Sequence, residues 1–207
     1  MEDLIGKLEE RLKQPLPGRA AYGGMIPRMA KKKISFKFDE EPRKGAVLIL
    51  LYPDAGLIKF PLIQRPVYEG VHSGQIALPG GRFEIADENL IQTALRETHE
   101  EIGVPSDQIE IIGQLSEFMV SASNHLVLPV VGYSRLKPSF LKDDFEVDEI
   151  IEAPLDHLLD AGRIKEKEIV TTYGYRLHSP YYDLEGKVVW GATAMMLSEF
   201  VQIINDL

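Results

Sequence analysis

The stretch LPGGRFEIADENLIQTALRETHEEIGV, from Leu78 to Val104, carries the strongest pattern in the chain. After a Pro-Gly-Gly turn, apolar residues recur at helical spacing, which predicts an amphipathic helix over residues 87–103. The side chains of Glu97, Glu100 and Glu101 stand at i, i+3 and i+4 of this helix, within an arc of about 100° that borders its apolar face. Like charges at this spacing destabilise a helix by roughly 0.2–0.5 kcal/mol per pair, so the stripe is either solvated or neutralised by cations.

Two interpretations of this carboxylate stripe compete. Spacing alone favours a solvated helix face, because clusters of surface glutamates are common. The turn at Gly80 and Gly81 changes the balance, since glycine lets the backbone approach a ligand or metal closely. Three carboxylates beside such a turn are hard oxygen donors that suit Mg²⁺ or Mn²⁺, and metal ions held in this way commonly bind the charged oxygens of a phosphate chain. The pattern therefore favours a metal-dependent phosphate site.

Composition narrows the function classes. The chain has 207 residues, which suits one domain with a sizeable core. Its net charge of −9 argues against a nucleic-acid groove. The absence of cysteine excludes disulfides and thiolate metal sites and fits a reducing compartment. The acidic start is unlike a signal peptide and no apolar run approaches the ~18 residues of a membrane span, so we expect a cytoplasmic protein without membrane contact. Composition leaves the oligomeric state open, and a homodimer is only a guess.

Periodicity predicts a mixed α/β fold. Residues 2–14 have helical spacing and precede a basic extension, so we expect residues 1–44 to pack on a domain formed by residues 45–207. Because strands and helices do not alternate regularly, a mixed sheet packed by helices is expected rather than a doubly wound one. The apolar runs predict strands at 45–52, 57–64, 75–78, 108–115 and 126–132, a strand and short helix within 146–160, two strands within 167–183 and a closing helix over 190–204.

The Leu78–Val104 stretch resembles the signature of Nudix hydrolases, which reads Gly, five residues, Glu, seven residues, then Arg-Glu-aliphatic-x-Glu-Glu-x-Gly-aliphatic. The chain departs from it in two places, because Thr98 replaces the aliphatic residue and six residues rather than five separate Gly81 from Glu88. The resemblance implies the Nudix α/β/α sandwich, with a mixed β-sheet and a loop–helix–loop catalytic motif. The second half of the signature matches at Glu88, Arg96, Glu97, Glu100, Glu101, Gly103 and Val104.

The resemblance also implies roles for the residues that match. It places Arg96, Glu97, Glu100 and Glu101 in the catalytic motif, with the three glutamates and the carbonyl of Gly81 holding Mg²⁺ or Mn²⁺. Arg96 would tether the preceding loop through a carboxylate. The extra loop residue leaves the loop register uncertain, so three partners for Arg96 stay open: Glu84, Asp87 and Glu88. The general base is also open, with Glu97, Glu101 and a loop carboxylate as candidates.

One subgroup of the family, the coenzyme A diphosphatases, shares the longer spacing. The upstream segments of that subgroup resemble residues 62–65 (LIQR), 72–75 (HSGQ) and 78–81 (LPGG), although Leu78 replaces a Phe and Gly70 stands where a basic residue is common. The resemblance implies hydrolysis of coenzyme A or acyl-CoA to 3′-phosphoadenosine 5′-phosphate and a 4′-phosphopantetheine. A diphosphatase for ADP-ribose, a dinucleotide or a nucleoside triphosphate is the alternative. A non-catalytic nucleotide-binding module is a third reading, which the retained glutamates oppose.

Three groups of residues are candidates to contact this nucleotide-derived substrate. Arg65 lies at the end of a predicted strand that leads toward the site, and Gln75 belongs to the upstream pattern. Lys31, Lys32 and Lys33 follow Arg28 in the densest positive stretch of an acidic chain. We expect these lysines to contact the 3′-phosphate of coenzyme A, because local positive charge must offset the long-range repulsion of the protein. A solvated basic loop is the competing interpretation.

Overall fold

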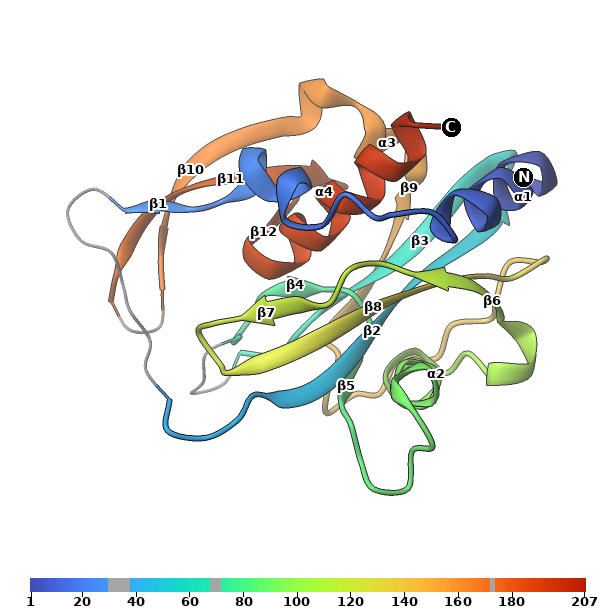
Figure 1. The fold of residues 1–207 in the computed structure, drawn as a ribbon, viewed down its shortest axis with the longest axis horizontal. Coiled ribbons are helices and arrows are strands. Elements are labelled where there is room, and N and C mark those ends of the chain that lie inside the picture. Colours follow the sequence, from blue (N-terminus) through green and yellow to red (C-terminus); the bar gives the residue numbers. More distant parts are fainter. Residues whose placement is uncertain (30–37, 68–71, 172–173) are drawn as a thin grey trace.

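A computed structural model describes residues 1–29, 38–67, 72–171 and 174–207 (Figure 1). Its large sheet is mixed, with strand order β4-β3-β2-β8-β6; β5 pairs with β2, β7 with β8, and β9 with β3. The strands are β2 (Arg43–Asp54), β3 (Leu57–Gln64), β4 (Ile76–Ala77), β5 (Gly80–Arg82), β6 (Glu110–Gln114), β7 (Phe118–Val120), β8 (His125–Tyr133) and β9 (Glu149–Pro154).

The parallel pair β2 and β8 forms the centre of this sheet, with Arg43 opposite His125 and Leu51 opposite Tyr133. Both strands read as nearly continuous apolar runs because both of their faces are covered. Side chains alternate between the faces, so Leu48 belongs to one apolar cluster and Ile49 to another.

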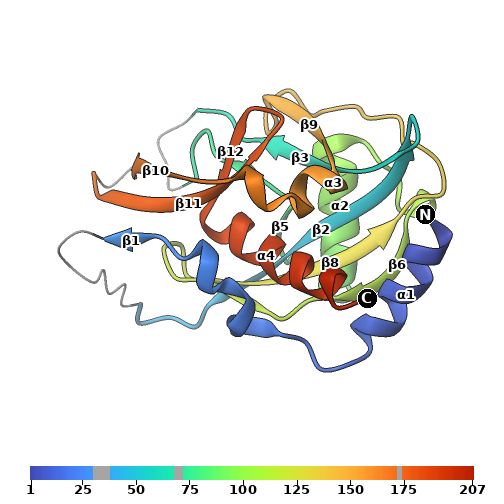
Figure 2. The same ribbon diagram turned by 90° about the horizontal axis from the view of Figure 1, so that it is seen from above.

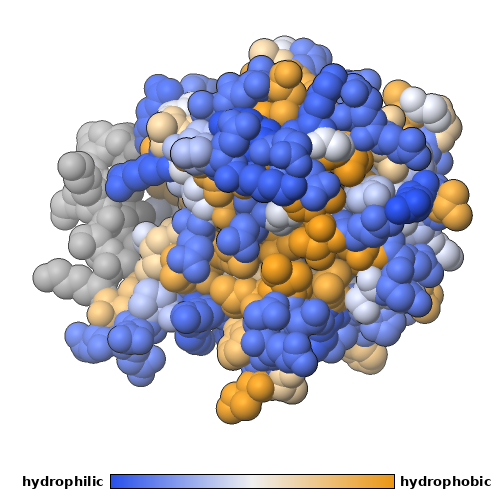
Figure 3. All heavy atoms as spheres, turned by 45° about the vertical axis from the view of Figure 1, so that its right-hand side comes forward, coloured by the Kyte–Doolittle hydropathy of each residue, from blue (hydrophilic) through white to orange (hydrophobic). Residues whose placement is uncertain are grey.

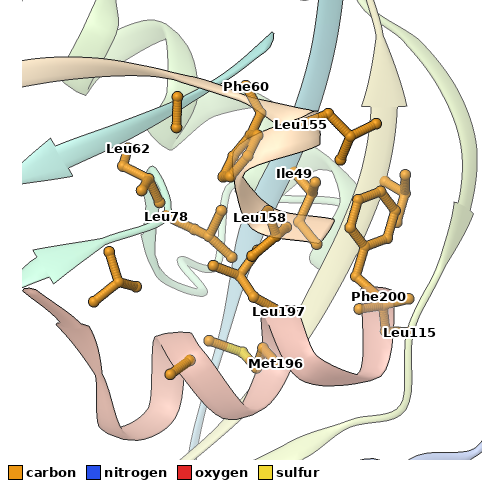
Figure 4. Packing of buried hydrophobic residues seen from close by; sticks show 14 of the residues in the cluster. Ile49, Phe60, Leu62, Leu78, Leu115, Leu155, Leu158, Met196, Leu197 and Phe200 are labelled. Atoms are coloured by element: carbon orange, nitrogen blue, oxygen red, sulfur yellow. The ribbon is translucent and has the colours of Figure 1, made fainter. Parts of the chain in front are cut away.

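Two helices cover the opposite faces of the large sheet (Figures 1 and 2). Helix α2 (Leu90–Ile102) packs on the face that carries Leu48, and helix α4 (Gly191–Asn205) packs on the face of Ile49. A short helix α3 (Leu155–Leu159) follows β9. Figure 4 shows how the larger cluster interlocks, with side chains of the sheet, α3 and α4 pointing toward one another: Ile49, Phe60, Leu62, Leu78, Leu115, Leu155, Leu158, Met196, Leu197 and Phe200.

A second sheet lies beside α4 and extends past it at one end of the molecule (Figure 2). Its order is β1-β11-β10, and β12 pairs with β11; the bounds are Arg28–Met29 (β1), Ile164–Val170 (β10), Arg176–Leu184 (β11) and Lys187–Trp190 (β12). Among the described residues, 3₁₀ helices complete the connections at Gly18–Met25, Ser106–Gln108 and Ala161–Arg163. At the opposite end lie helix α1 (Glu2–Leu12) and both termini (Figure 1).

The N-terminal segment contributes to the core rather than lying on its surface. Ile5 and Leu8 of α1, and Tyr22 and Met25 of the first 3₁₀ helix, are buried in the same cluster as α4. From the side that carries the termini, hydrophilic side chains surround an apolar area in the middle of the face (Figure 3). Within the described residues, no helix is long and apolar enough to cross a membrane.

The expected mixed sheet packed by helices is confirmed. The expected start of the central helix was wrong: α2 begins at Leu90 instead of residue 87, because Asp87 takes part in a turn and Asn89 caps the helix. The expected short strand at 75–78 corresponds to β4, but sequence periodicity missed β1, β5, β7 and β12, because segments of two to four residues carry little period-2 signal.

A buried carboxylate on α4 joins segments that are distant in the chain. Glu199 has 0% of its surface exposed, and it accepts hydrogen bonds from the backbone N–H of Gly18 (2.8 Å), the Ser116 hydroxyl (2.6 Å) and the Ser116 N–H (3.3 Å). Burial, followed by the charge of Glu199, raises the pKa of Tyr22 to about 12. Glu199 therefore ties the N-terminal segment to the loop before β7.

We predict that Glu199→Ala lowers the free energy of unfolding by about 1–3 kcal/mol, because it leaves partly buried donors without their acceptor. Urea denaturation followed by circular dichroism measures this. Glu117→Ala is the matched control, since Glu117 is exposed and close in sequence to Ser116, and it should stay within about 0.5 kcal/mol of the parent. Equal stability of the two variants would mean that Glu199 does not hold the N-terminal segment to the loop before β7.

Candidate functional site

Helix α2 is positioned by its caps. The side chain of Asn89 accepts hydrogen bonds from the N–H groups of Ile91 (3.0 Å) and Gln92 (3.1 Å), which satisfies two of the free donors at the helix start. The helix ends at Gly103, whose φ of 73° is the left-handed conformation favoured at this position. These caps set which side chains of α2 face the loop that precedes it.

Arg96 holds this loop to the helix through Asp87. Its Nε donates to Asp87 Oδ1 (2.9 Å), while its Nη2 donates to Asp87 Oδ2 (3.0 Å) and to the Arg82 carbonyl (2.9 Å). Asp87 also accepts from the Glu84 N–H and the Thr93 hydroxyl, and the Arg96 guanidinium holds the pKa of Asp87 well below its usual range. Of the three partners left open by the sequence, the structure therefore selects Asp87.

Glu84 and Glu88 do not share this role. Both side chains are exposed, and neither forms an ion pair with Arg96 in the described part of the chain. The signature glutamate, Glu88, thus points to solvent while its neighbour Asp87 is buried. Asp87 keeps the five-residue spacing counted forward from Gly81, whereas Glu88 keeps the seven-residue spacing counted back from Arg96, and the structure shows that the first of these carboxylates is the buried one.

The same guanidinium contacts two carboxylates of the stripe. Arg96 Nη1 donates to Glu97 Oε1 (3.1 Å) and to Glu100 Oε2 (2.8 Å). These contacts offset the repulsion between neighbouring like charges on the helix. Glu97 is largely buried, whereas Glu100 is half exposed, and burial raises the pKa of Glu97. One arginine therefore connects the loop to two of the three glutamates.

The third carboxylate, Glu101, is the most buried. Only 1% of its surface is exposed, and its Oε2 accepts a hydrogen bond from the Gly80 N–H (2.7 Å). Burial raises the pKa of Glu101 to about 8, although the Arg65 charge and the Gly80 hydrogen bond act against this shift. Arg65 Nη2 lies 3.7 Å from Glu101 Oε1 and donates to the Gly80 carbonyl (3.2 Å). The expected substrate contact Arg65 thus lies beside the carboxylates.

Both glycines of the turn are required by close contacts. A Cβ on Gly80, whose φ is 147°, would lie 2.3 Å from the Ala46 carbonyl oxygen. A Cβ on Gly81 would lie 2.5 Å from the carboxylate atoms of Glu97. Gly81 also pairs with Ala46 in the β2–β5 ladder, so the turn joins the sheet and presses directly against α2.

A fourth carboxylate, that of Glu146, comes from a distant segment. Its charge helps to raise the pKa of both Glu97 and Glu101. The segment is held at the end of α2, where the Asp143 N–H donates to the Glu101 carbonyl (3.0 Å), and Asp143 Oδ1 accepts from the Glu146 N–H (3.0 Å). No spacing rule relates these residues to the helix, so the sequence analysis missed Glu146.

The donor set fits a divalent cation chemically. As the side chains stand, no group of three or more acidic or histidine residues in the described ranges is arranged around a single metal position. The reason is that Glu97 and Glu100 turn to Arg96, while Glu101 turns to Gly80. All four carboxylates are hard oxygen donors, and the raised pKa of two of them reflects buried charge that their neighbours only partly compensate.

The remaining candidates are less closely tied to the carboxylates. Gln75 is half-buried, and its Oε1 lies 3.2 Å from Nδ1 of His72 in the loop after β3. Burial lowers the pKa of His72. Lys31, Lys32 and Lys33 lie outside the described residues, so their expected contact stays a prediction.

Comparisons with known proteins agree on one family. The model of the NUDIX domain matches residues 42–173, more than half of the chain. The chain is 32% identical over 174 residues to an uncharacterised Nudix hydrolase, NudL of Yersinia pestis (strain Pestoides F), covering 83% of this chain and 84% of that protein.

Solved structures show the same fold. The Nudix hydrolase RenU from M. smegmatis superposes with a TM-score of 0.57 at 17% identity, over 81% of this chain and 89% of that one. A MutT/nudix family protein from Enterococcus faecalis gives 0.52 at 19% identity, over 83% and 66%. These structures agree with the expected α/β/α sandwich.

We predict that Arg96 and Asp87 are energetically coupled. In a double-mutant cycle with Arg96→Ala and Asp87→Asn, the interaction free energy from urea denaturation should be about 1–3 kcal/mol. Because the pKa of Asp87 is lowered in the folded state, this stabilisation is present above pH ~4 and is lost as the pH falls below that value. A parallel cycle with Glu88→Gln should show no coupling, and coupling of Glu88 instead would mean that the loop register is wrong.

Proposed function

Because this chain belongs to the Nudix hydrolase family, we propose that it hydrolyses a diphosphate linkage in a nucleotide-derived substrate, using Mg²⁺ or Mn²⁺. Members of this family generally use divalent metal ions. The observation that carries the proposal is the carboxylate set of α2, which Arg96 joins to the loop and to the glycine turn. Such a set suits cations that hold a phosphate chain.

The residues that would hold the cation are Glu97, Glu100, Glu101 and the carbonyl of Gly81. A divalent cation, when bound, supplies positive charge for the diphosphate oxygens and makes water a better nucleophile. Arg96 orients Glu97 and Glu100 and keeps the loop in place. Oriented charges of this kind stabilise a transition state without reorganising during the reaction.

The other groups of the chain bind substrate and move a proton. The Arg65 guanidinium lies next to Glu101, where it can contact a phosphate oxygen of the diphosphate. A general base must remove a proton from the attacking water, and three carboxylates are candidates: Glu97, Glu101 and the loop residue Glu146. The raised pKa of Glu97 and Glu101 brings both groups closer to the operating pH of such a base.

Coenzyme A or an acyl-CoA is the substrate that we favour. The support comes from the segments that resemble the coenzyme A diphosphatases. Two residues of these segments lie near the site: Arg65 beside the carboxylates and Gln75 in the adjoining loop. ADP-ribose, dinucleotides and other nucleoside diphosphate derivatives form the second class. The retained Glu97, Glu100 and Glu101 oppose a module that only binds nucleotide.

We predict that Glu100→Gln and Glu101→Gln each lower kcat at least ~10²-fold, which is about 2.7 kcal/mol of transition-state stabilisation. Folding should survive, because each change removes one of several clustered negative charges. Steady-state kinetics with Mg²⁺ measure the effect, and the exposed Glu88→Gln serves as the control with near-parent turnover. Near-full turnover of either variant would disprove the metal assignment.

A substrate panel tests the reaction itself. Incubation with Mg²⁺ or Mn²⁺ should convert coenzyme A to 3′-phosphoadenosine 5′-phosphate and 4′-phosphopantetheine, identified by mass spectrometry, and EDTA should stop the reaction. Faster cleavage of ADP-ribose, a dinucleotide or a nucleoside triphosphate would select the second class. Tight binding of the panel without products from any member would identify a binding module.

A further inference from the structure

Three strand ends bring two arginine side chains and one histidine side chain to the same end of the large sheet. β2 begins at Arg43, β8 begins at His125, and β5 ends at Arg82. In the ladders Arg43 lies opposite His125, and Gly45 lies opposite Arg82. Because residues i and i+2 of a strand, and residues directly opposite each other, share a face, the three side chains belong to the same face of the sheet.

This face is the one that α4 covers further along the strands. Val47 and Ile49 continue the alternation from Arg43, and both pack in the cluster of α4. The neighbouring Gly81 confirms the alternation in β5, since a side chain there would meet Glu97 of α2 on the opposite face. The backbone of Arg82 is nevertheless part of the carboxylate site, because its carbonyl accepts a hydrogen bond from Arg96 (2.9 Å).

The charges of these groups act on one another. The pKa of His125 is lowered by burial and also by the nearby charges of Arg43, Arg82 and His72. The pKa of His72 is in turn lowered by burial and by the charge of Arg65. The basic side chains at the strand ends therefore lie within electrostatic reach of His72, which in turn lies within reach of Arg65 beside Glu101.

Two of these basic residues, Arg43 and Arg82, have no acidic partner among the described residues. Arg96, Arg135 and Arg176 each pair with a carboxylate, whereas no carboxylate of the described residues lies within 4 Å of the guanidinium of Arg43 or Arg82. Within the described residues, the guanidinium of Arg43 donates one hydrogen bond, to the Ser123 carbonyl (3.4 Å). Both guanidinium groups belong to exposed residues, so two adjacent arginines without an acidic partner among the described residues offer a place where an anion can bind.

We propose that Arg43 and Arg82, together with His125, bind a second anionic group of the substrate, a phosphate monoester on the nucleotide. This rests on the proposed function, in which the diphosphate lies at the carboxylates on the other side of β5. A guanidinium presents several donors in a plane and binds phosphate oxygens in pairs. Gly45, opposite Arg82, holds the two arginines on adjacent strands close together, because its missing Cβ lets the Gly81 carbonyl approach; a Cβ there would lie 2.4 Å from that oxygen.

The proposal selects a class of substrate. A nucleotide that carries a monophosphate in addition to its diphosphate, such as a 3′-phosphorylated adenosine derivative, meets both sites. ADP-ribose, and dinucleotides that carry no monophosphate, have no group that could bind at the second site. The subsite therefore favours one class among those that the carboxylate site accepts.

Binding measured without turnover tests the subsite. Isothermal titration calorimetry in EDTA compares 3′-phosphoadenosine 5′-phosphate with adenosine 5′-phosphate, which differ only by the second phosphate. We expect the parent protein to bind the first compound at least ~10-fold more tightly, and the ratio should shrink as salt rises. Arg43→Gln combined with Arg82→Gln should remove most of this ratio and leave the affinity for adenosine 5′-phosphate within about twofold.

Arg135→Gln is the matched control, because Arg135 follows the far end of β8 and pairs there with Glu110. It removes one positive charge, half of that removed in the double variant, without touching the strand ends. Equal binding of the two compounds by the parent, equal losses for both in the double variant, or the same loss in Arg135→Gln would each overturn the subsite. Absence of hydrolysis across the substrate panel would overturn the proposed function, whereas a retained affinity ratio would still support the subsite.

Discussion

The contact between Arg96 and Asp87 is the constraint on which the site depends. A guanidinium can donate several hydrogen bonds in one plane, and Arg96 uses them on Asp87, the Arg82 carbonyl and two glutamates. The loop, strand β5 and helix α2 thus meet at one side chain. A lysine would offer a single charged nitrogen and could not span these acceptors, which explains why the position needs arginine.

This arrangement makes close packing of like charges tolerable. Glu101 is buried against the Gly80 N–H, and Glu97 lies where a side chain on Gly81 would otherwise be. Desolvation of a carboxylate disfavours its charged form, so the pKa of both glutamates is raised. The glycine turn therefore does more than reverse the chain: it supplies a backbone donor and leaves room for a buried acid.

The two faces of the central sheet carry different chemical groups. On one face, α2 carries the carboxylates; on the other, the ends of β2, β5 and β8 gather arginine and histidine side chains. Strand β5 contributes to both faces because its adjacent residues point in opposite directions. Gly81 lies against Glu97, and Arg82 lies opposite Gly45. A substrate with two anionic groups would thus meet both faces around one short edge strand.

The sequence by itself determined the local features of this protein. Helical spacing placed Glu97, Glu100 and Glu101 on one arc, and apolar runs predicted the long strands. The extra residue after the glycine turn indicated that the register of the loop was open. Tertiary structure decided that Asp87 is the partner of Arg96, that Glu101 is buried, that the charge of Glu146 acts on Glu97 and Glu101, and that Arg43, Arg82 and His125 share one face of the sheet. Periodicity acts over a few residues along the chain, whereas loop register, burial and strand pairing depend on packing between segments that the order of residues does not place side by side.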